Sequence, residues 1–217
     1  MTFVPRLDIL PPAQRAVWPE LADVPRTFVL YGGTGLALRL GHRASIDFDF
    51  FASAPLEHEV LERLALVRDG ITVQHGPSER TVLVERAGAT VKLSFFGALP
   101  FGRVAEPTAT VDGVLRVASL LDLGGTKIKA LLQRVEAKDY RDIAALLANG
   151  VALTEILGAG QALFGTGFNP LIAQKALCYF KGGDLESLDA LTRDLLATHA
   201  AQDLDIALLP LAAARVD

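Results

Sequence analysis

The sequence has very little cysteine, one residue in 217, and no long apolar run. Cys178 has no partner within the chain, which excludes an internal disulfide, and we expect it to be a small buried hydrophobic residue. The most apolar stretch, residues 151–168, is interrupted by Glu155, Gln161 and several glycines, so we expect no transmembrane helix. The first residues also lack the basic and apolar regions of a signal peptide, and we expect a cytoplasmic protein that does not contact membranes.

Hydrophobic residues make up 51% of the chain and charged residues 21%, which is enough apolar material for a packed core and argues against disorder. The length is typical of one large domain or two small ones. The formal net charge is −4, so nucleic acid could be bound only through a local basic patch.

The order of predicted elements indicates an α+β fold, a mixed sheet with flanking helices that is followed by a mostly helical C-terminal half. We therefore predict two domains, residues 1–115 and 116–217. In the first, β-forming residues predict strands over 27–31, 45–51, 71–74, 81–86 and 90–96, and a turn at Ala87 and Gly88 predicts a hairpin between the last two. Helices are predicted over 11–20, 34–40, 56–66, 120–148, 153–163, 171–179, 185–198 and 204–214.

The most informative local pattern is a strand that ends at Gly32 and Gly33, a short helix, and a second strand with alternating residues. Thr34 is a candidate N-cap of the helix and Gly41 a candidate stop. In the second strand Ile46, Phe48 and Phe50 share one side, and Ser45, Asp47 and Asp49 share the other. The two carboxylates should therefore lie about 7 Å apart on one face of the sheet.

Two carboxylates this close repel each other, and a divalent metal between them is the simplest explanation. Mg²⁺ is commonly held by one or two carboxylates together with substrate phosphates. The Gly-Gly turn lets the backbone approach a phosphate, and the following helix presents free N–H groups to that anion. These parts suit phosphoryl or nucleotidyl transfer. A plain turn and a solvated strand face are the alternatives for each part taken alone.

Residues 32–43 and 45–51 resemble the signature of the AbiEii/AbiGii-type toxins, which are nucleotidyltransferase-fold proteins of abortive-infection and toxin–antitoxin systems. A second block supports the resemblance. Lys127 is followed seven residues later by Arg134, and Lys138-Asp139 is followed by Asp142, in the order of two downstream motifs of that family.

The resemblance implies a Mg²⁺- and NTP-dependent enzyme that transfers a nucleotide to an acceptor, in some members the 3′ end of tRNA, with a cognate antitoxin as a candidate partner. It implies that Asp47 and Asp49 are metal ligands and, with Lys127, catalytic residues. The candidate nucleotide-binding residues are Gly32, Gly33, Thr34, Lys127, Arg134, Lys138, Asp139 and Asp142.

If residues 120–148 form one helix, then Lys127, Arg134 and Lys138 lie within about 40° of one line along it. The alternative is an ordinary surface helix with a Lys138–Asp142 pair at i, i+4. If the helix breaks near residues 135–137, the alignment fails and the residues must meet through the fold.

Many nucleotidyltransferases carry a third carboxylate on a later strand, where it can act as a base. The equivalent strand here has Lys92, Ser94 and Phe96 on its polar side and no acid. Three hypotheses therefore stay open: an active nucleotidyltransferase toxin, a catalytically inactive module that binds nucleotide or RNA, and a regulatory protein held by an antitoxin.

Overall fold

The computed structural model describes residues 2–217 and confirms an α+β fold with a mixed sheet, flanking helices and a helical second half. Two compact units divide the chain. The first comprises residues up to 102, 106–119 and 213–217, and the second comprises residues 103–105 and 120–212. These bounds differ from the predicted domains because the last strand and the last five residues belong to the first unit.

Within the described residues, eight strands form one sheet in the order β1-β7-β8-β2-β3-β6-β5-β4. β3 lies antiparallel to β2 and parallel to β6, so it is a central strand with a partner on each side. The strands in chain order are β1 (Thr2–Phe3), β2 (Val29–Tyr31), β3 (Asp47–Phe51), β4 (Ile71–Gly76), β5 (Glu79–Arg86), β6 (Ala89–Phe96), β7 (Thr108–Thr110) and β8 (Arg116–Val117).

The predicted hairpin is confirmed as β5 and β6, which pair antiparallel from Glu79 opposite Phe96 to Arg86 opposite Ala89. Ala87 and Gly88 join the strands with φ values of 49° and 76°. Two successive left-handed residues are typical of the two-residue turn whose twist matches that of the flanking strands.

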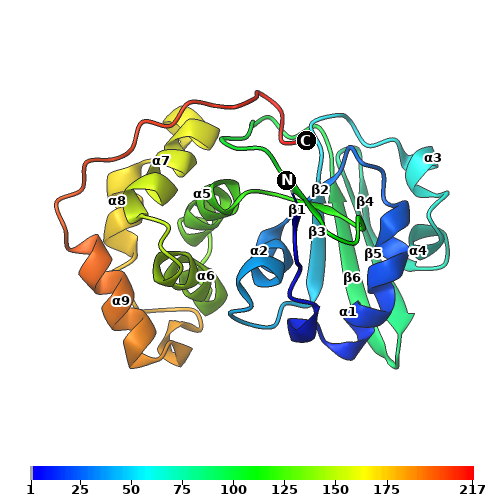
Figure 1. The fold of residues 1–217 in the computed structure, drawn as a ribbon, viewed down its shortest axis with the longest axis horizontal. Helices are drawn as coiled ribbons and strands as arrows, with labels where there is room; N and C mark the ends of the chain where they lie inside the picture. Colours follow the sequence, from blue (N-terminus) through cyan, green and yellow to red (C-terminus); the bar gives the residue numbers. More distant parts are fainter. Residues whose placement is uncertain (1) are drawn as a thin grey trace. The chain divides into compact units, whose positions relative to one another are not determined.

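Helices cover both faces of this sheet in the first unit. In Figure 1, α1, α3 and α4 lie on one face and α2 lies on the other. The bounds are α1 (Pro12–Val17), α2 (Gly32–Leu40), α3 (His58–Leu61) and α4 (Ala65–Arg68), with 3-10 helices η1 (Leu7–Ile9) and η2 (Trp18–Asp23).

The prediction of one helix over residues 56–66 is wrong, because a turn at residues 62–64 separates α3 from α4. Leu61 and Leu66 are both buried. Five residues apart on one helix, they would point about 140° away from each other. The turn lets both side chains enter the core.

The core lies on the face of the sheet that α1, α3 and α4 cover, and Phe48 and Phe50 of β3 are fully buried there. Phe50 stacks on Phe95 of β6 with ring centroids 5.1 Å apart. Ile46 was expected on this apolar side, but it is 61% exposed. β3 begins only at Asp47, and the carbonyl of Ile46 instead accepts a hydrogen bond from the Gln14 side chain.

The second unit is helical, and its helices are α5 (Leu120–Leu131), α6 (Ala137–Ala148), α7 (Leu153–Phe164), α8 (Pro170–Ala176) and α9 (Ala190–Ala200), with 3-10 helices η3 (Gly165–Gly167) and η4 (Leu185–Ser187). Cys178 is exposed, contrary to expectation, because it follows the end of α8. None of the helices in residues 2–217 is both long and apolar enough to cross a membrane.

No helix forms over the predicted stretch 204–214 of the described chain. This segment bonds to α7 instead: the N–H of Ala207 donates to the carbonyl of Thr154, and the carbonyl of Ala207 lies where a side chain at Gly158 would stand. Pro210 also lacks the N–H that a continuous helix needs.

Candidate active site

The glycine turn that the sequence singles out joins β2 directly to α2. Gly32 has φ +70°, a left-handed conformation that favours glycine. A Cβ at Gly32 would collide with Oδ2 of Asp49, and one at Gly33 would lie 2.6 Å from Nη2 of Arg43. The two glycines therefore leave room for a carboxylate and a guanidinium group beside the start of the helix.

Thr34 is not the N-cap of this helix, because α2 begins two residues earlier, at Gly32. Its side chain is fully buried, and the hydroxyl donates to the carbonyl of Asp47 and lies 2.9 Å from Oγ of Ser45. Thr34 thus ties α2 to the first residue of β3. Its contact with a nucleotide stays a prediction.

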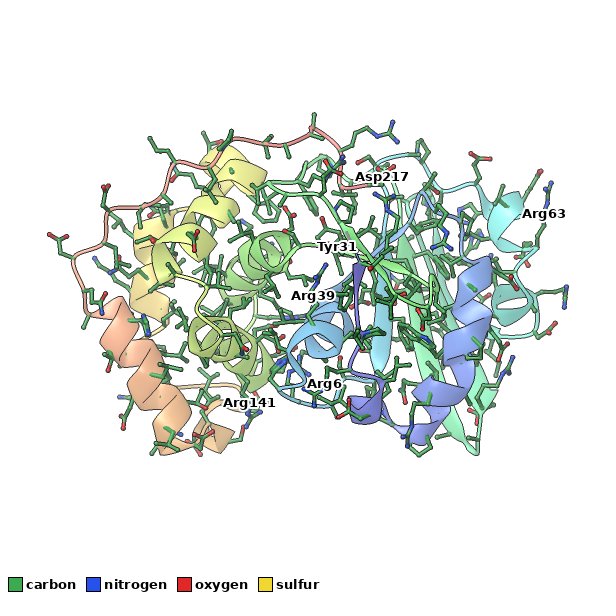
Figure 2. All side chains as sticks on the ribbon, viewed as in Figure 1. Arg6, Tyr31, Arg39, Arg63, Arg141 and Asp217 are labelled. Atoms are coloured by element: carbon green, nitrogen blue, oxygen red, sulfur yellow. The ribbon has the colours of Figure 1, made fainter. Side chains whose placement is uncertain are left out.

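The other end of α2 is held by Arg39, whose guanidinium group donates to the carbonyls of Val117 and Ala118 at 2.9 and 2.8 Å (Figure 2). The guanidinium carbon lies 4.3 Å from the ring centroid of Phe3. Burial lowers the pKa of Arg39 to about 10, so the group is charged at neutral pH. As predicted, Gly41 ends the helix in a left-handed conformation.

Asp47 and Asp49 project from the same face of β3, opposite Phe48 and Phe50, as the alternating sequence predicts. Tyr31 of β2 is paired with Asp49 across one side of the strand. On the other side, Asp47 is paired with Lys92 of β6, and Asp49 with Ser94.

The two carboxylates have different surroundings. Oδ2 of Asp47 lies 2.9 Å from Nζ of Lys92, whereas Asp49 lies over Gly32 at the glycine turn. Ser94 is buried beside Asp49, and its Oγ lies 3.3 Å from Oγ1 of Thr81. The parallel register therefore places a hydroxyl, not a third carboxylate, next to Asp49.

Whether these residues can hold a divalent metal depends on how many ligands they supply. In residues 2–217, no three His, Cys, Asp or Glu side chains are grouped so that they could hold a metal ion alone. Two carboxylates on one face still suit Mg²⁺, which usually takes its other ligands from water and substrate phosphate. The residues present fit a cation shared with a nucleotide.

The second block forms a charged cluster in the helical unit. Nζ of Lys127, on α5, lies 2.9 Å from Oδ1 of Asp139 and 2.7 Å from Oδ2 of Asp142, both on α6. Arg134 binds Asp139 with two hydrogen bonds, of 2.7 and 3.1 Å. Both aspartates are fully buried, and the Lys127 side chain is only 6% exposed.

The prediction of one helix over residues 120–148 is wrong, since the chain leaves the helical conformation between α5 and α6 and Glu136 is extended. The stripe of aligned cations therefore does not form. Asp142 pairs with Lys127 instead of Lys138, and Nζ of Lys138 lies 2.7 Å from Glu136. Lys127 and Arg134 thus bind the buried aspartates, whereas Lys138 pairs with Glu136 at the start of α6.

The cluster shifts the titration of Asp139. Burial raises the pKa of this carboxyl group, but the hydrogen bond from Arg134 and the charge of Lys127 together outweigh burial and hold the pKa below its usual range. Asp139 is therefore ionised at neutral pH and can keep Lys127 and Arg134 in place.

Sequence reasoning gave no role to Arg43 or Lys92. Arg43 lies inside the signature segment, but only the folded turn shows that its guanidinium group lies beside Gly33. Lys92 was expected on the polar side of its strand, but its pairing with Asp47 depends on the register between two strands that are distant in sequence.

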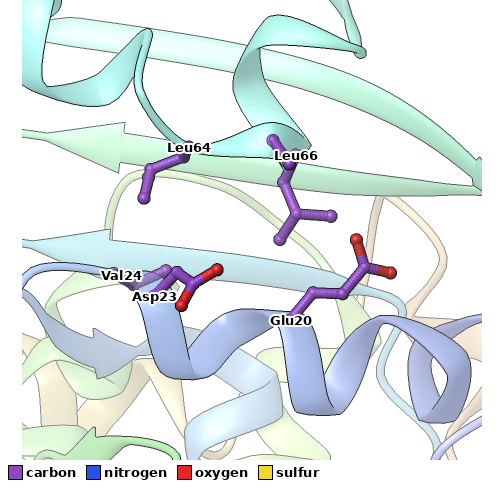
Figure 3. Close-up of a pocket in the computed structure, with 6 residues that line it drawn as sticks. Glu20, Asp23, Val24, Leu64 and Leu66 are labelled. Carbon is purple, nitrogen blue, oxygen red and sulfur yellow. The ribbon is translucent and has the colours of Figure 1, made fainter.

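A small cavity of about 90 Å³ lies between η2 and α4, lined by Glu20, Asp23, Val24, Leu64, Ala65 and Leu66 (Figure 3). Val24, Leu64 and Leu66 belong to the same core cluster as Phe48 and Phe50. The cavity is therefore on the face of the sheet opposite the aspartates. It is also smaller than the roughly 300 Å³ at which ligand pockets begin.

With this geometry in view, comparison with known families matches residues 20–208 to the nucleotidyl transferase AbiEii toxins of type IV toxin–antitoxin systems. The chain belongs to this family. It is accordingly a toxin-type nucleotidyltransferase, as the resemblance of residues 32–43 and 45–51 to the toxin signature implies. No protein with curated annotation matches the sequence significantly.

Two solved structures share the fold of this AbiEii-family chain. One is MenT4, a nucleotidyltransferase toxin of Mycobacterium tuberculosis H37Rv, with 16% identity, a TM-score of 0.63, and coverage of 88% of this chain and 82% of that one. The other is a protein of H. pylori assigned as a nucleotidyltransferase, with 21% identity, a TM-score of 0.55, and coverage of 87% and 90%. At these identities the likeness concerns the fold alone.

Proposed function

We propose that this protein transfers a nucleotide from an NTP to an RNA acceptor, with tRNA as the first candidate, in a Mg²⁺-dependent reaction that makes it a toxin. The observation that carries the proposal is the glycine turn, where Gly32 leaves room for the carboxylate of Asp49 beside the start of α2 and Asp47 shares the same face.

Each group has a role in this proposal. Asp47 and Asp49 would hold Mg²⁺, which supplies positive charge to phosphoryl oxygens when bound. The N–H groups of Gly32 and Gly33 and the N-terminal end of α2 attract the anionic phosphates. Lys127 and Arg134 are proposed phosphate contacts, with Lys127 also catalytic. Asp139 and Asp142 hold Lys127 in position, since the carboxylate of each forms an ion pair with the ammonium group of Lys127.

The acceptor, the nucleotide and the biological setting are the finer parts of the proposal. The proposal of an RNA acceptor and a cognate antitoxin rests on the family resemblance and not on a basic surface, because the net charge is −4. A cytoplasmic location fits both partners. Thr34 and Lys138 complete the proposed nucleotide-binding set.

The test is transfer of label. Purified protein is incubated with Mg²⁺, each α-labelled NTP in turn, and total tRNA or ribosomal RNA. We expect label on RNA with one preferred nucleotide, abolished by EDTA and by the Asp47→Asn/Asp49→Asn double variant. Transfer that survives in the double variant would contradict the proposal.

The second candidate is a module that binds nucleotide or RNA without chemistry, and the buried Ser94 beside Asp49 favours it. Nucleotide binding that depends on Asp47 and Asp49, with no label on any RNA tested, would support this candidate. Multiple turnovers by the wild-type protein would exclude it.

A further inference from the structure

Lys92 and Asp47 form an ion pair on the face of the sheet that carries the proposed metal ligands. They are cross-strand neighbours in the parallel β3–β6 pair, with Nζ and Oδ2 2.9 Å apart. Lys92 is paired on its other side with Leu83 of β5, which carries no charge. Asp47 is therefore the carboxylate that the strand register brings beside this lysine.

The pair changes the charge that a metal ion would meet. Lys92 offsets the negative charge of Asp47, and the guanidinium group of Arg43 lies at the glycine turn near Asp49. A cation at Asp47 would have to displace the ammonium group or bind beside it, and like charges at that separation repel. Asp49 lies over Gly32 at the glycine turn and is the cross-strand neighbour of Tyr31 and Ser94, so the strand register does not bring Lys92 directly opposite it.

We propose that Lys92 is a built-in counter-ion that competes with the divalent cation for Asp47. When the nucleotide binds, Lys92 releases Asp47, which is then available to the cation. This inference rests on the proposed function, because it takes Asp47 as a metal ligand. The side chains of Lys92 and Asp47 are 41% and 34% exposed, so solvent screens the pair and the ammonium group has room to move.

The nucleotide favours that movement because its phosphates offer the ammonium group another anionic partner. The cation then binds weakly alone and more tightly with the nucleotide. Lys92 thus couples the two binding events, and by linkage the cation tightens nucleotide binding by the same factor.

Mn²⁺ binding, followed by electron paramagnetic resonance of the free ion, tests this without any turnover. The full chain is titrated with Mn²⁺ alone and with a non-hydrolysable NTP analogue present. Lys92→Gln should bind Mn²⁺ alone about two- to fivefold more tightly than wild type, the range expected for removing a partly exposed ion pair. The analogue should tighten Mn²⁺ binding less in Lys92→Gln than in wild type.

Two variants serve as controls. Lys92→Arg keeps the positive charge and should match wild type, and Lys175→Gln removes one charge from an exposed position on α8 and should also match it. Asp47→Asn identifies the site, because it should weaken Mn²⁺ binding. Thermal melting of each variant confirms that it is folded.

The outcomes separate this inference from the proposed function. If Asp47→Asn weakens Mn²⁺ binding but Lys92→Gln leaves it unchanged or weaker, the counter-ion role is wrong and the metal site stands. If Lys92→Gln and Lys175→Gln tighten binding equally, the effect is one of net charge and the inference fails. If Asp47→Asn binds Mn²⁺ as tightly as wild type does, the metal site and the inference both fail.

Discussion

Gly32 is the residue on which the geometry of the active site depends most. Its left-handed conformation turns the chain from β2 into α2, and its missing side chain leaves space for Asp49. Both properties are needed together, because a residue with a Cβ would be strained and would also displace the carboxylate.

Gly32→Ala should therefore abolish transfer, with a loss of more than about 100-fold, because the metal and phosphate groups would be displaced. Gly113 is a matched control, since it has φ +71° and nothing within 4 Å of an added Cβ. Both substitutions should cost about 1–2 kcal/mol of stability. Equal transfer rates in Gly32→Ala and Gly113→Ala, measured beside thermal melting, would show that the space over Gly32 is not needed.

Much of this residue-scale site could be predicted from the sequence. Alternation places Asp47 and Asp49 on one face, and two adjacent glycines after a strand indicate a tight turn. The ion pair of Asp47 with Lys92 could not be predicted, because a parallel register between strands over 40 residues apart leaves no local sequence signal. The position of Arg43 could not be predicted either, because its guanidinium group approaches Gly33 only in the folded turn.

Among the elements, α5 and α6 are joined by the buried Lys127, Asp139 and Asp142, and the half-exposed Arg134 also binds Asp139. A buried carboxylate is costly unless a cation and hydrogen bonds compensate it. The two aspartates share the one ammonium group of Lys127, so this side chain stabilises the helix pair whatever its role in catalysis.

Lys127→Met should destabilise the protein by about 3–5 kcal/mol, because it leaves Asp139 and Asp142 buried with less compensation. Lys175→Met, at an exposed position of α8, should change stability by less than about 0.5 kcal/mol. Urea unfolding measures both. A Lys127→Met protein as stable as wild type would mean that the cluster does not hold the helices together.

Acid should weaken the same helix pair through Asp139, whose pKa is lowered in the folded state. The unfolded carboxyl group titrates near 4, so as the pH falls below about 5 the unfolded state takes up the proton first. The stabilisation is complete above that range and is lost as the pH falls through 4 toward the lower folded pKa.

Urea unfolding between pH 3 and 7 tests this prediction. Asp139→Asn should lower stability at pH 7 and lose less stability on acidification than wild type. Asp23→Asn, at an exposed position, should keep the wild-type pH dependence. An unchanged pH dependence in Asp139→Asn would contradict the assignment.

The break between α5 and α6 shows why element boundaries were harder to predict than element types. Residues 120–148 are helical in composition, and only the tertiary pairing of Lys127 with Asp139 and Asp142 reveals that the chain must turn back. The helix predicted over the apolar residues 204–214 does not form for a different reason, because the backbone of this segment bonds to α7. In both cases contacts distant in sequence override the local preference.

For the whole molecule, the sequence predicted the fold class and the family, because the signature segment and the second block occur in the family's order and the family match spans residues 20–208. The division into two units was harder to predict, since residues 213–217 return to the first unit. Asp217 accepts a hydrogen bond from the N–H of Ser53 there, at 3.1 Å.

The most direct test of the central claim is the initial rate of NTP-to-RNA transfer in Asp47→Asn and Asp49→Asn, measured singly beside Asp23→Asn. The control makes the same chemical change at an exposed position of η2. We predict that each active-site variant loses at least about 100-fold in rate while it melts near the wild-type temperature, and that Asp23→Asn keeps the full rate. A wild-type rate in either active-site variant would contradict the claim that this carboxylate pair carries the reaction.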